Sequence, residues 1–450
     1  MASNRLPPPT SELLGTVESL CPICLKRVSG QYRQVGEQVL LEKACPQHGS
    51  FAAVVWRGEP DFRSWLRPKI PWRGGSRRPV ERGCPLDCGL CENHGQRTCT
   101  VLVEITSRCN LGCPVCFADS GSTAVDPGID ELQRLFVRVM EQTGGCNLQL
   151  SGGEPTVRDD LAEVVRRAVR AGFEFVQLNT NGLRFVEDPE LAHRLKDAGL
   201  SSVFLQFDGV TEHPYTLLRG RPLYELKCRA VDALASAGLG IVLVPTISRK
   251  ANLDQLFALV GFGVARLPQV RGVHFQPLSL FGRYPAVLQG DHVTLPELMR
   301  GLVEQSGGRL AVADFHPPGC EHALCSFSAR YLVHEDHGLQ RLGSGSCDCR
   351  PLPAAQGAAT AIAVTARQWT GVTDPDVAAS APRDDLDRFL GRARSHTFSI
   401  SAMAFQDAWT LSLERLRGCC IHVAQPDGRL VPFCSYNLTA ADGTSLHRTR

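Results

Sequence analysis

The sequence lacks a long hydrophobic run, a hydrophobic leader and a marked excess of either charge. Its longest apolar stretches, such as residues 256–265, are too short to span a bilayer, and residues 1–15 contain no apolar core of a secretory signal. Lys and Arg total 48 against 46 Asp and Glu, for a net charge of +2. That balance excludes the strongly basic footprint of a general nucleic-acid binder. We therefore expect a cytoplasmic protein, and its 450 residues are enough for two or three domains.

Isolated cysteines are also few, although the chain has 19 cysteines in all. Cys146 and Cys228 stand alone, and we expect both to be buried apolar side chains. The others fall in clusters, and in a reducing compartment clustered cysteines indicate metal ligation rather than disulfides. Cys347 and Cys349 are spaced too closely for an easy shared cluster, so we predict no ligand role for them.

Residues 21–58 predict a small metal module of the rubredoxin or zinc-ribbon kind, preceded by a flexible tail at 1–20. Two ligand pairs with x2 spacing flank a predicted hairpin, which is typical of a tetrahedral metal site. The four candidate ligands are Cys21, Cys24, Cys45 and His48. These residues leave open whether the metal is zinc or a mononuclear iron. Residues 59–83 are rich in Pro, Arg and Gly and predict a linker.

Residues 101–315 alternate between strand and helix patterns, which predicts an α/β fold with a parallel sheet and outer helices. The expected strands cover 101–106, 146–151, 173–179, 201–207, 240–247 and 272–278, and the expected helices 129–142, 158–172, 188–199, 223–238 and 252–267. The pattern alone does not separate an open sheet from a partial barrel. Regularity falls after residue 300, so residues 316–450 are predicted as a third, cysteine-bearing region.

The spacing C-x3-C-x2-C occurs twice, within the segments 84–100 and 109–116. A closed [4Fe–4S] site needs four thiolates, and the first copy has a fourth cysteine nearby. That set is Cys84, Cys88, Cys91 and Cys99. The second copy has no such partner, so it is expected to leave one iron open. Its members are Cys109, Cys113 and Cys116.

The second copy follows the first expected strand, at the end where α/β sheets bind ligands. The next strand ends in "SGGEP", and later ones end in "NTNG", "QFDG" and "VPT". "CNLGCPVC" after one strand with "GGEP" after the next resembles the radical S-adenosylmethionine (SAM) enzymes. The resemblance implies that SAM chelates the open iron and that one electron from the reduced cluster cleaves the sulfonium C–S bond of SAM. The resulting 5′-deoxyadenosyl radical abstracts hydrogen from unactivated carbon. The implied fold is a partial (βα)6 radical SAM barrel with an N-terminal rubredoxin-like module and a C-terminal auxiliary-cluster region.

Within that resemblance, polar and glycine residues at the strand ends are expected to contact SAM. Gly152 and Gly153 would let the backbone approach its methionine part, and Glu154 would accept a hydrogen bond from its ammonium group. Asn179, Asn181 and Asp208 are further expected contacts to ribose or carboxylate, although such residues also cap helices.

Two auxiliary [4Fe–4S] clusters are expected besides the SAM cluster, although zinc is the alternative for the first cysteine set. The later one would be held by Cys320, Cys325, Cys419 and Cys434. Cys419 is preferred to its neighbour Cys420, which would then be a packing residue. His94 is either a donor to the first auxiliary cluster or a surface-loop residue.

A narrower resemblance rests on "CPLDCGLCENHGQRTC", "CNLGCPVCFADS", "SGGEPTVRDDL", "FLQFDGV", "HFQPLSLFGR" and "VPFCSYNL", in that order. With the N-terminal module, these segments resemble the tetraether lipid synthase family and its bacterial relatives. The resemblance implies coupling of lipid hydrocarbon chains through a C–C bond, with a low-potential electron donor, oxygen sensitivity and possible peripheral membrane contact. Two alternatives are a radical SAM methyltransferase acting on a pterin-like or other small substrate and a non-catalytic iron–sulfur electron carrier. The stretch from Pro351 to Asp387 departs from the family pattern.

Overall fold

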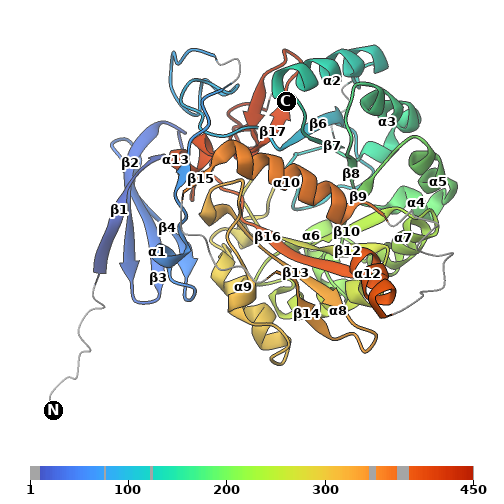
Figure 1. Ribbon diagram of the computed structural model, residues 1–450. Helices are drawn as coiled ribbons and strands as arrows, with labels where there is room; N and C mark the ends of the chain where they lie inside the picture. The colour runs from blue at the N-terminus through green and yellow to red at the C-terminus, as the bar shows by residue number, and fades with distance from the viewer. Residues whose placement is uncertain (1–10, 75–77, 122–124, 344–350, 372–384, 449–450) are drawn as a thin grey trace.

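The computed structural model describes residues 11–74, 78–121, 125–343, 351–371 and 385–448 (Figure 1). The strands are β1 (Ser11–Leu20), β2 (Arg27–Val35), β3 (Gln38–Cys45), β4 (Gly49–Arg57), β5 (Lys69–Ile70), β6 (Thr100–Thr106), β7 (Asn147–Gly152), β8 (Val176–Thr180), β9 (Ser202–Gln206), β10 (Gly240–Val244), β11 (Thr246–Ile247), β12 (Val270–Pro277), β13 (Ser326–Val333), β14 (Leu339–Arg341), β15 (Leu352–Pro353), β16 (Thr397–Met403), β17 (Ile421–Ala424) and β18 (Leu430–Pro432). The helices are α1 (Phe62–Trp65), α2 (Ile129–Thr143), α3 (Leu161–Arg170), α4 (Leu183–Glu187), α5 (Glu190–Asp197), α6 (Glu212–Arg219), α7 (Tyr224–Ser236), α8 (Leu256–Val264), α9 (Leu295–Gln305), α10 (Ala354–Trp369), α12 (Asp385–Ser395), α13 (Leu413–Arg417) and α14 (Phe433–Tyr436).

A four-stranded antiparallel sheet, β1-β2-β3-β4, forms the N-terminal part of the molecule. The prediction that residues 1–20 are a flexible tail is wrong for its second half, because β1 pairs with β2 from Ser11 to Leu20. The segment "SELLGTVESL" alternates only weakly between apolar and polar residues. Pairing with β2 and burial of Leu20 therefore decide that it is a strand.

The predicted linker at 59–83 is also wrong in part, because it contains α1 and β5. Phe62 and Trp65 are buried against Trp56 of β4. The Trp65 indole nitrogen donates to the Ala323 carbonyl oxygen over 2.9 Å. Two aromatic anchors thus fix this segment between the small sheet and the rest of the chain.

The main sheet contains the six predicted parallel strands, side by side in chain order as β6-β7-β8-β9-β10-β12. These strands are short and almost completely buried, as expected where helices cover a parallel sheet. The sheet is open, since its path runs from β14 to β18 without closing among the described strands. This confirms the expected α/β fold with a parallel sheet that does not close into a full barrel.

The C-terminal region completes both edges of this sheet rather than forming a separate body after residue 315. β16 pairs in parallel with β12, and β13 and β14 extend that edge. β17 pairs in parallel with β6 at the opposite edge, and β18 follows it. The predicted boundary at 315 is therefore wrong, because one sheet runs across it.

Helices α2, α3, α5, α4 and α7 form the outer layer beyond the strands (Figure 1). α10 instead crosses the middle of the molecule (Figure 1) and contacts β10, β12 and β16. Among the described residues, no helix combines the length and the apolar character that crossing a bilayer requires.

Candidate functional site

A cavity of about 680 Å³ lies within the main sheet, beneath α10. Its walls come from the inner face of the strands, from the loop after β6, and from α10. Two cysteine sets border it. They are Cys109, Cys113 and Cys116, and Cys99, Cys320 and Cys420.

The loop that carries the first set follows β6, as the sequence predicts. Two arginines fix its backbone, because Arg219 Nη1 donates to Val115 O over 3.1 Å and Arg283 Nε donates to Cys113 O over 3.0 Å. Burial raises the pKa of the Cys109 and Cys113 thiols, so these thiols lose their protons only where a cation such as iron stabilises the thiolates. Three thiols on one rigid loop facing a cavity fit a cluster with one open iron.

Gly152 and Gly153 border the cavity at the end of β7. Glycine is required at both positions because the neighbouring backbone leaves no room for a Cβ atom. A Cβ on Gly152 would lie 2.1 Å from Thr106 O, and one on Gly153 would lie 2.2 Å from Arg108 O. Gly152 also has a φ of +129°. These glycines therefore let β7 meet the start of the cysteine loop. The expected approach of their backbone to SAM stays a prediction.

Glu154 is buried beside the cavity, and its carboxylate already accepts several hydrogen bonds from the protein. Its Oε1 accepts from Thr156 N, Thr156 Oγ1 and Thr180 Oγ1, at 3.1, 2.7 and 2.6 Å. Its Oε2 accepts from Asn181 N over 2.6 Å. Oε2 is thus the oxygen with capacity left for a ligand ammonium group.

The three remaining predicted contacts differ in their surroundings. Asn179 borders the cavity, and its buried Oδ1 has no hydrogen-bond partner among the described residues. Asn181 also borders it, but its Oδ1 accepts from Leu183 N over 3.0 Å at the start of α4. Asp208 is fully buried and does not border the cavity, since both oxygens accept from Arg219 at 2.7 Å. The expected contact between Asp208 and a cofactor is therefore wrong.

The four predicted ligands of the N-terminal module converge, with one ligand atom from each lying within 4.8 Å of the others. They are Cys21, Cys24, Cys45 and His48. His48 Nδ1 lies 3.6 Å from Cys21 Sγ and 3.5 Å from Cys45 Sγ. A hydrogen bond from the Gln47 backbone, opposed by burial and aided by His48, lowers the pKa of Cys45 to about 6. This donor set fits a closed tetrahedral ion.

Cys84, Cys88 and Cys91 line a small hollow together with His94. Burial, and then the neighbouring Cys84, raises the pKa of Cys88. His94 is buried and its Nε2 lies 2.8 Å from Cys419 O, so the surface-loop alternative for it is wrong.

Cys99 does not join that set, which corrects the prediction that it closes the first cluster. Its Sγ lies within 4.8 Å of the thiols of Cys320 and Cys420. The reason is strand register: β17 pairs with β6 at Ile421↔Thr100, and Cys99 N donates to Cys420 O over 2.8 Å. The preference for Cys419 over Cys420 as the partner of Cys320 is therefore also wrong.

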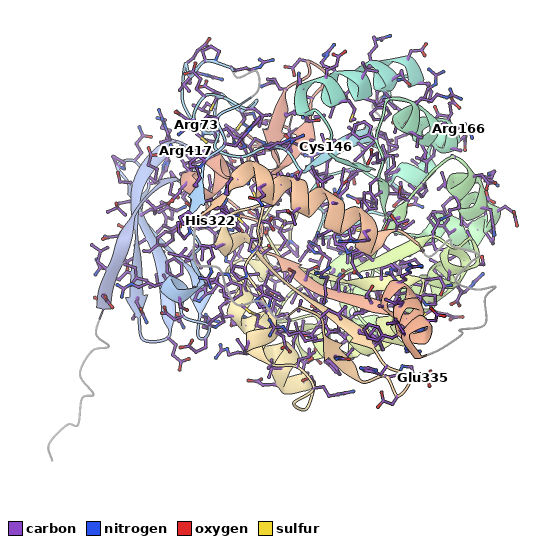
Figure 2. The ribbon with its side chains drawn as sticks, in the orientation of Figure 1. Arg73, Cys146, Arg166, His322, Glu335 and Arg417 are labelled. Atoms are coloured by element: carbon purple, nitrogen blue, oxygen red, sulfur yellow. The ribbon has the colours of Figure 1, made fainter. Side chains whose placement is uncertain are left out.

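The other members of the predicted later cluster are not part of the group of Cys99, Cys320 and Cys420. They are Cys325, Cys419 and Cys434. Burial, and then Cys434 and Cys325, raises the pKa of the Cys419 thiol. Arg415 donates to Cys325 Sγ from two nitrogens, each over 3.4 Å. Cys146, labelled in Figure 2, lies directly before β7 and is buried as expected, whereas Cys228 is only half-buried. Cys347 and Cys349 lie outside the described residues.

Several residues in the cavity wall or directly behind it carry no local sequence signal. Arg219 ends a helix, and Lys227 is a buried amine whose Nζ donates to Gln206 Oε1 over 2.8 Å. Burial lowers the pKa of Lys227 to about 8 and that of His274 to about 4. His274 lies beside Phe204 and Trp369, with ring centroids 5.3 and 6.0 Å away. Only the folded sheet brings these residues together.

Comparison with known proteins agrees with this geometry. Residues 103–261 match the family model described as the radical SAM superfamily, and residues 13–57 match the HMPTM N-terminal zinc ribbon domain. The 7,8-dihydro-6-hydroxymethylpterin dimethyltransferase of Methanocaldococcus jannaschii is 30% identical, covering 96% of this chain and 93% of the relative. The GTP 3′,8-cyclase of Paenarthrobacter nicotinovorans is 29% identical, covering 45% of this chain and 58% of the relative. Streptococcus suis SuiB bound to S-adenosylmethionine covers 48% of each chain at 14% identity, with a TM-score of 0.39.

Proposed function

The chain belongs to the radical SAM superfamily, and we propose that it is a methyltransferase acting on a pterin-like bicyclic ring. The observation that carries the proposal is the 30% identity to a pterin dimethyltransferase across 96% of this chain and 93% of that relative. A match of that extent includes the N-terminal module, the barrel and the C-terminal cysteine-bearing region. Membership in the superfamily itself implies a radical SAM enzyme with a [4Fe–4S] cluster and SAM.

Cys109, Cys113 and Cys116 would hold the cluster, and Glu154 Oε2 would receive the SAM ammonium group. When bound, the cluster and SAM supply a radical that removes hydrogen from carbon. The protein's own contribution is to fix the loop and exclude water. Arg219 and Arg283 hold the loop backbone, and Asp208 holds Arg219. A buried guanidinium with a bidentate carboxylate has one preferred geometry, which keeps the cysteine loop in place.

The cavity supports a small, planar and polar substrate. About 680 Å³ lies in the range of roughly 300–1,000 Å³ that is usual for small-molecule sites. Strands β7, β8, β9 and β12 each place one side-chain amide in its wall, and these amides suit the donors and acceptors at the edge of a heterocycle. They are Gln149, Asn179, Gln206 and Gln276. Phe204 and Trp369, 5.5 Å apart, provide aromatic surface for ring stacking.

The first prediction from sequence, coupling of lipid chains, has no support in these comparisons. The two curated relatives reported above are named for pterin and GTP chemistry, not for lipid. Lipid coupling and membrane contact therefore stay predictions, and the small-molecule alternative becomes the proposal.

The experiment is an anaerobic incubation of the purified enzyme with SAM, dithionite and 7,8-dihydro-6-hydroxymethylpterin. We expect 5′-deoxyadenosine and a pterin heavier by one or more methylene units. A second SAM supplies each methyl group, so one S-adenosylhomocysteine is expected for every methyl group transferred. The matched control replaces Cys109, Cys113 and Cys116 by alanine, and it is expected to form neither product.

Two outcomes would contradict the proposal. Formation of 5′-deoxyadenosine with unchanged pterin, together with a coupled product from a glycerol ether lipid, would favour lipid chemistry. Absence of 5′-deoxyadenosine from cluster-loaded protein under every condition would favour the electron-carrier alternative.

A further inference from the structure

One row of hydrogen-bonding groups crosses β7, β8, β9 and β10 at the same level of the main sheet. Gln149 of β7 is in register with Gln177 of β8. Gln177 is in register with Ser202 of β9, and Ser202 with Gly240 of β10. Gln177 and Ser202 are fully buried, whereas Gln149 lines the cavity. The row therefore runs from the interior of the sheet to the cavity wall and ends there at Gln149.

The hydrogen bonds along this row can run in one direction only. The Gly240 carbonyl oxygen can only accept, so the Ser202 hydroxyl donates its single hydrogen to it, over 3.1 Å. The Ser202 oxygen then accepts from Gln177 Nε2 over 3.2 Å, and Gln177 Oε1 accepts from Gln149 Nε2 over 2.7 Å. Reversal of either amide would place two acceptors against each other. A backbone carbonyl thus fixes the orientation of the Gln149 amide.

The Gln149 oxygen is consequently the acceptor that the row presents at the cavity wall. It accepts from Asn179 Nδ2 over a long 3.4 Å, which leaves a lone pair for a further donor. Asn179 lines the cavity as well, and its buried Oδ1 has no hydrogen-bond partner in the part of the chain that the structure describes. An unpaired buried acceptor is costly. Two neighbouring acceptor oxygens therefore favour a ligand that supplies N–H or O–H donors.

Aromatic rings lie near these two oxygens along the sheet. Phe204 of β9 is in register with Asn179, and its ring centroid lies 5.5 Å from that of Trp369 in α10. Neighbouring strands are about 4.8 Å apart, so Gln149 lies two strand spacings, or roughly 10 Å, from Phe204. A bicyclic ring that stacks on Phe204 can therefore direct one edge at the two oxygens.

We propose that Gln149, with Asn179 beside it, selects a substrate ring whose edge carries two adjacent N–H donors. The inference rests on the proposed function, because the 2-amino group and the N3–H of a pterin form such an edge. A ring with a 2-oxo group presents an acceptor at that place, which the fixed Gln149 oxygen repels. Gln149 contacts the substrate in this arrangement, whereas Gln177 and Ser202 are positioning residues that act through its amide.

The test compares two ligands on the unmodified protein by anaerobic equilibrium dialysis without SAM. One is 7,8-dihydro-6-hydroxymethylpterin, and the other is the matching lumazine, in which oxygen replaces the 2-amino group. We expect the pterin to bind at least about tenfold more tightly, because a site built to accept from an N–H group rejects the analogue that lacks it. Equal affinities would overturn the inference while the proposed function stands. Binding of neither ligand would overturn the proposed function and, with it, the substrate class named here.

Gln177→Leu tests whether the direction of the row sets this preference. The variant frees the Gln149 amide to turn and offer its nitrogen to the 2-oxo ring, so we expect the preference for the pterin to fall within about threefold. The matched control is Gln305→Leu, which removes a half-buried glutamine bonded to Phe257 N and Leu253 O. The control should keep the preference of the unmodified protein. Both ligands are measured on the same variant, so a lower folded fraction changes both affinities alike. An unchanged preference in Gln177→Leu, or an equal loss in Gln305→Leu, would disprove the role of the row.

Gln149→Leu tests the contact itself. We expect the pterin to bind at least about tenfold more weakly and the lumazine to bind within about threefold of its affinity for the unmodified protein. Formation of 5′-deoxyadenosine from SAM should persist, which shows that the variant is folded and carries its cluster. Unchanged pterin affinity in a variant that still cleaves SAM would rule out Gln149 as a substrate contact.

Discussion

At the scale of single residues, the function of a glycine pair depends on what the fold brings against it. The motif "GGEP" predicts a close approach of the backbone to a ligand, and the structure shows a close approach to another part of the backbone. Gly152 meets Thr106, and Gly153 meets Arg108. Both contacts lie at the root of the loop that carries Cys109. The pair therefore affects the cluster by positioning this loop.

Gly153→Ala tests this role against Gly112→Ala, a change within the same loop region. Among the described residues beyond its chain neighbours, no atom lies within 4 Å of a Cβ added at Gly112, whereas a Cβ at Gly153 would lie 2.2 Å from Arg108 O. We expect Gly153→Ala to lose about 2 kcal/mol of unfolding free energy and most 5′-deoxyadenosine formation. Gly112→Ala should change the unfolding free energy by less than about 0.5 kcal/mol. Denaturant unfolding and product assays measure both, and equal behaviour of the two variants would disprove the contact argument.

Asp208 shows the same dependence on partners. As a strand-end acid it resembled a ligand contact, but its carboxylate is used by Arg219. A buried carboxylate left without a partner would cost far more than the ion pair contributes. Arg219 in turn reaches the backbone of the cysteine loop. Asp208 therefore affects the site indirectly, by positioning Arg219.

At the scale of elements, α10 is the least predictable part of the cavity. Its sequence is rich in alanine, and the segment from Pro351 did not match the family pattern. Its buried face is small, with Ala354, Gly357 and Ala358 packed inward. Small residues let the helix approach the loop at Gly319 and close the cavity. Packing against a remote loop decides this role.

Val364→Trp is expected to fill part of the cavity, because Val364 lines it from α10. The matched control is Ala363→Trp, at an exposed position that does not line the cavity. We expect Val364→Trp to weaken pterin binding about tenfold or more. Ala363→Trp should leave binding unchanged within about twofold. Equilibrium dialysis compares them, and equal affinities would place the pterin outside this cavity.

At the scale of the whole molecule, the N-terminal sheet is joined to the barrel and is not an independent appendage. Arg57 Nη1 lies 2.8 Å from Glu297 Oε1 of α9, and Lys43 Nζ donates to Ala408 O over 2.7 Å. Arg417 pairs with Glu18 over 2.6 Å. Figure 2 shows Arg417 and His322 at the boundary between this sheet and the rest of the molecule. The metal module therefore stabilises an edge of the enzyme.

Removing one ligand of the N-terminal metal site should destabilise the N-terminal sheet. We expect Cys45→Ser to bind one metal ion fewer per chain, because the four-ligand site loses a thiolate. Amide hydrogen exchange in β3 and β4 should then rise at least about tenfold. The control is Cys228→Ser, a half-buried thiol in α7 that belongs to neither thiol group. Unchanged metal content and exchange in Cys45→Ser would show that Cys45 is not a ligand.

The sequence by itself determined the features that are encoded within short windows of chain. The open triplet at Cys109, Cys113 and Cys116, the paired ligands of the ribbon and the alternation of strands and helices are all of this kind. Spacing along one loop fixes which thiols meet, and hydrophobic periodicity fixes which segments become strands or helices. The radical SAM family and the parallel sheet could therefore be predicted from the sequence.

Only the tertiary structure decided which distant residues share a site. Cys99 joins Cys320 and Cys420 because the register of β17 on β6 places them there, although Cys84, Cys88 and Cys91 are closer in sequence. Likewise, the C-terminal strands extend both edges of the main sheet, and α10 covers the cavity. These contacts join segments more than a hundred residues apart. Pairing of strands and burial of side chains select them, and neither is visible in local spacing.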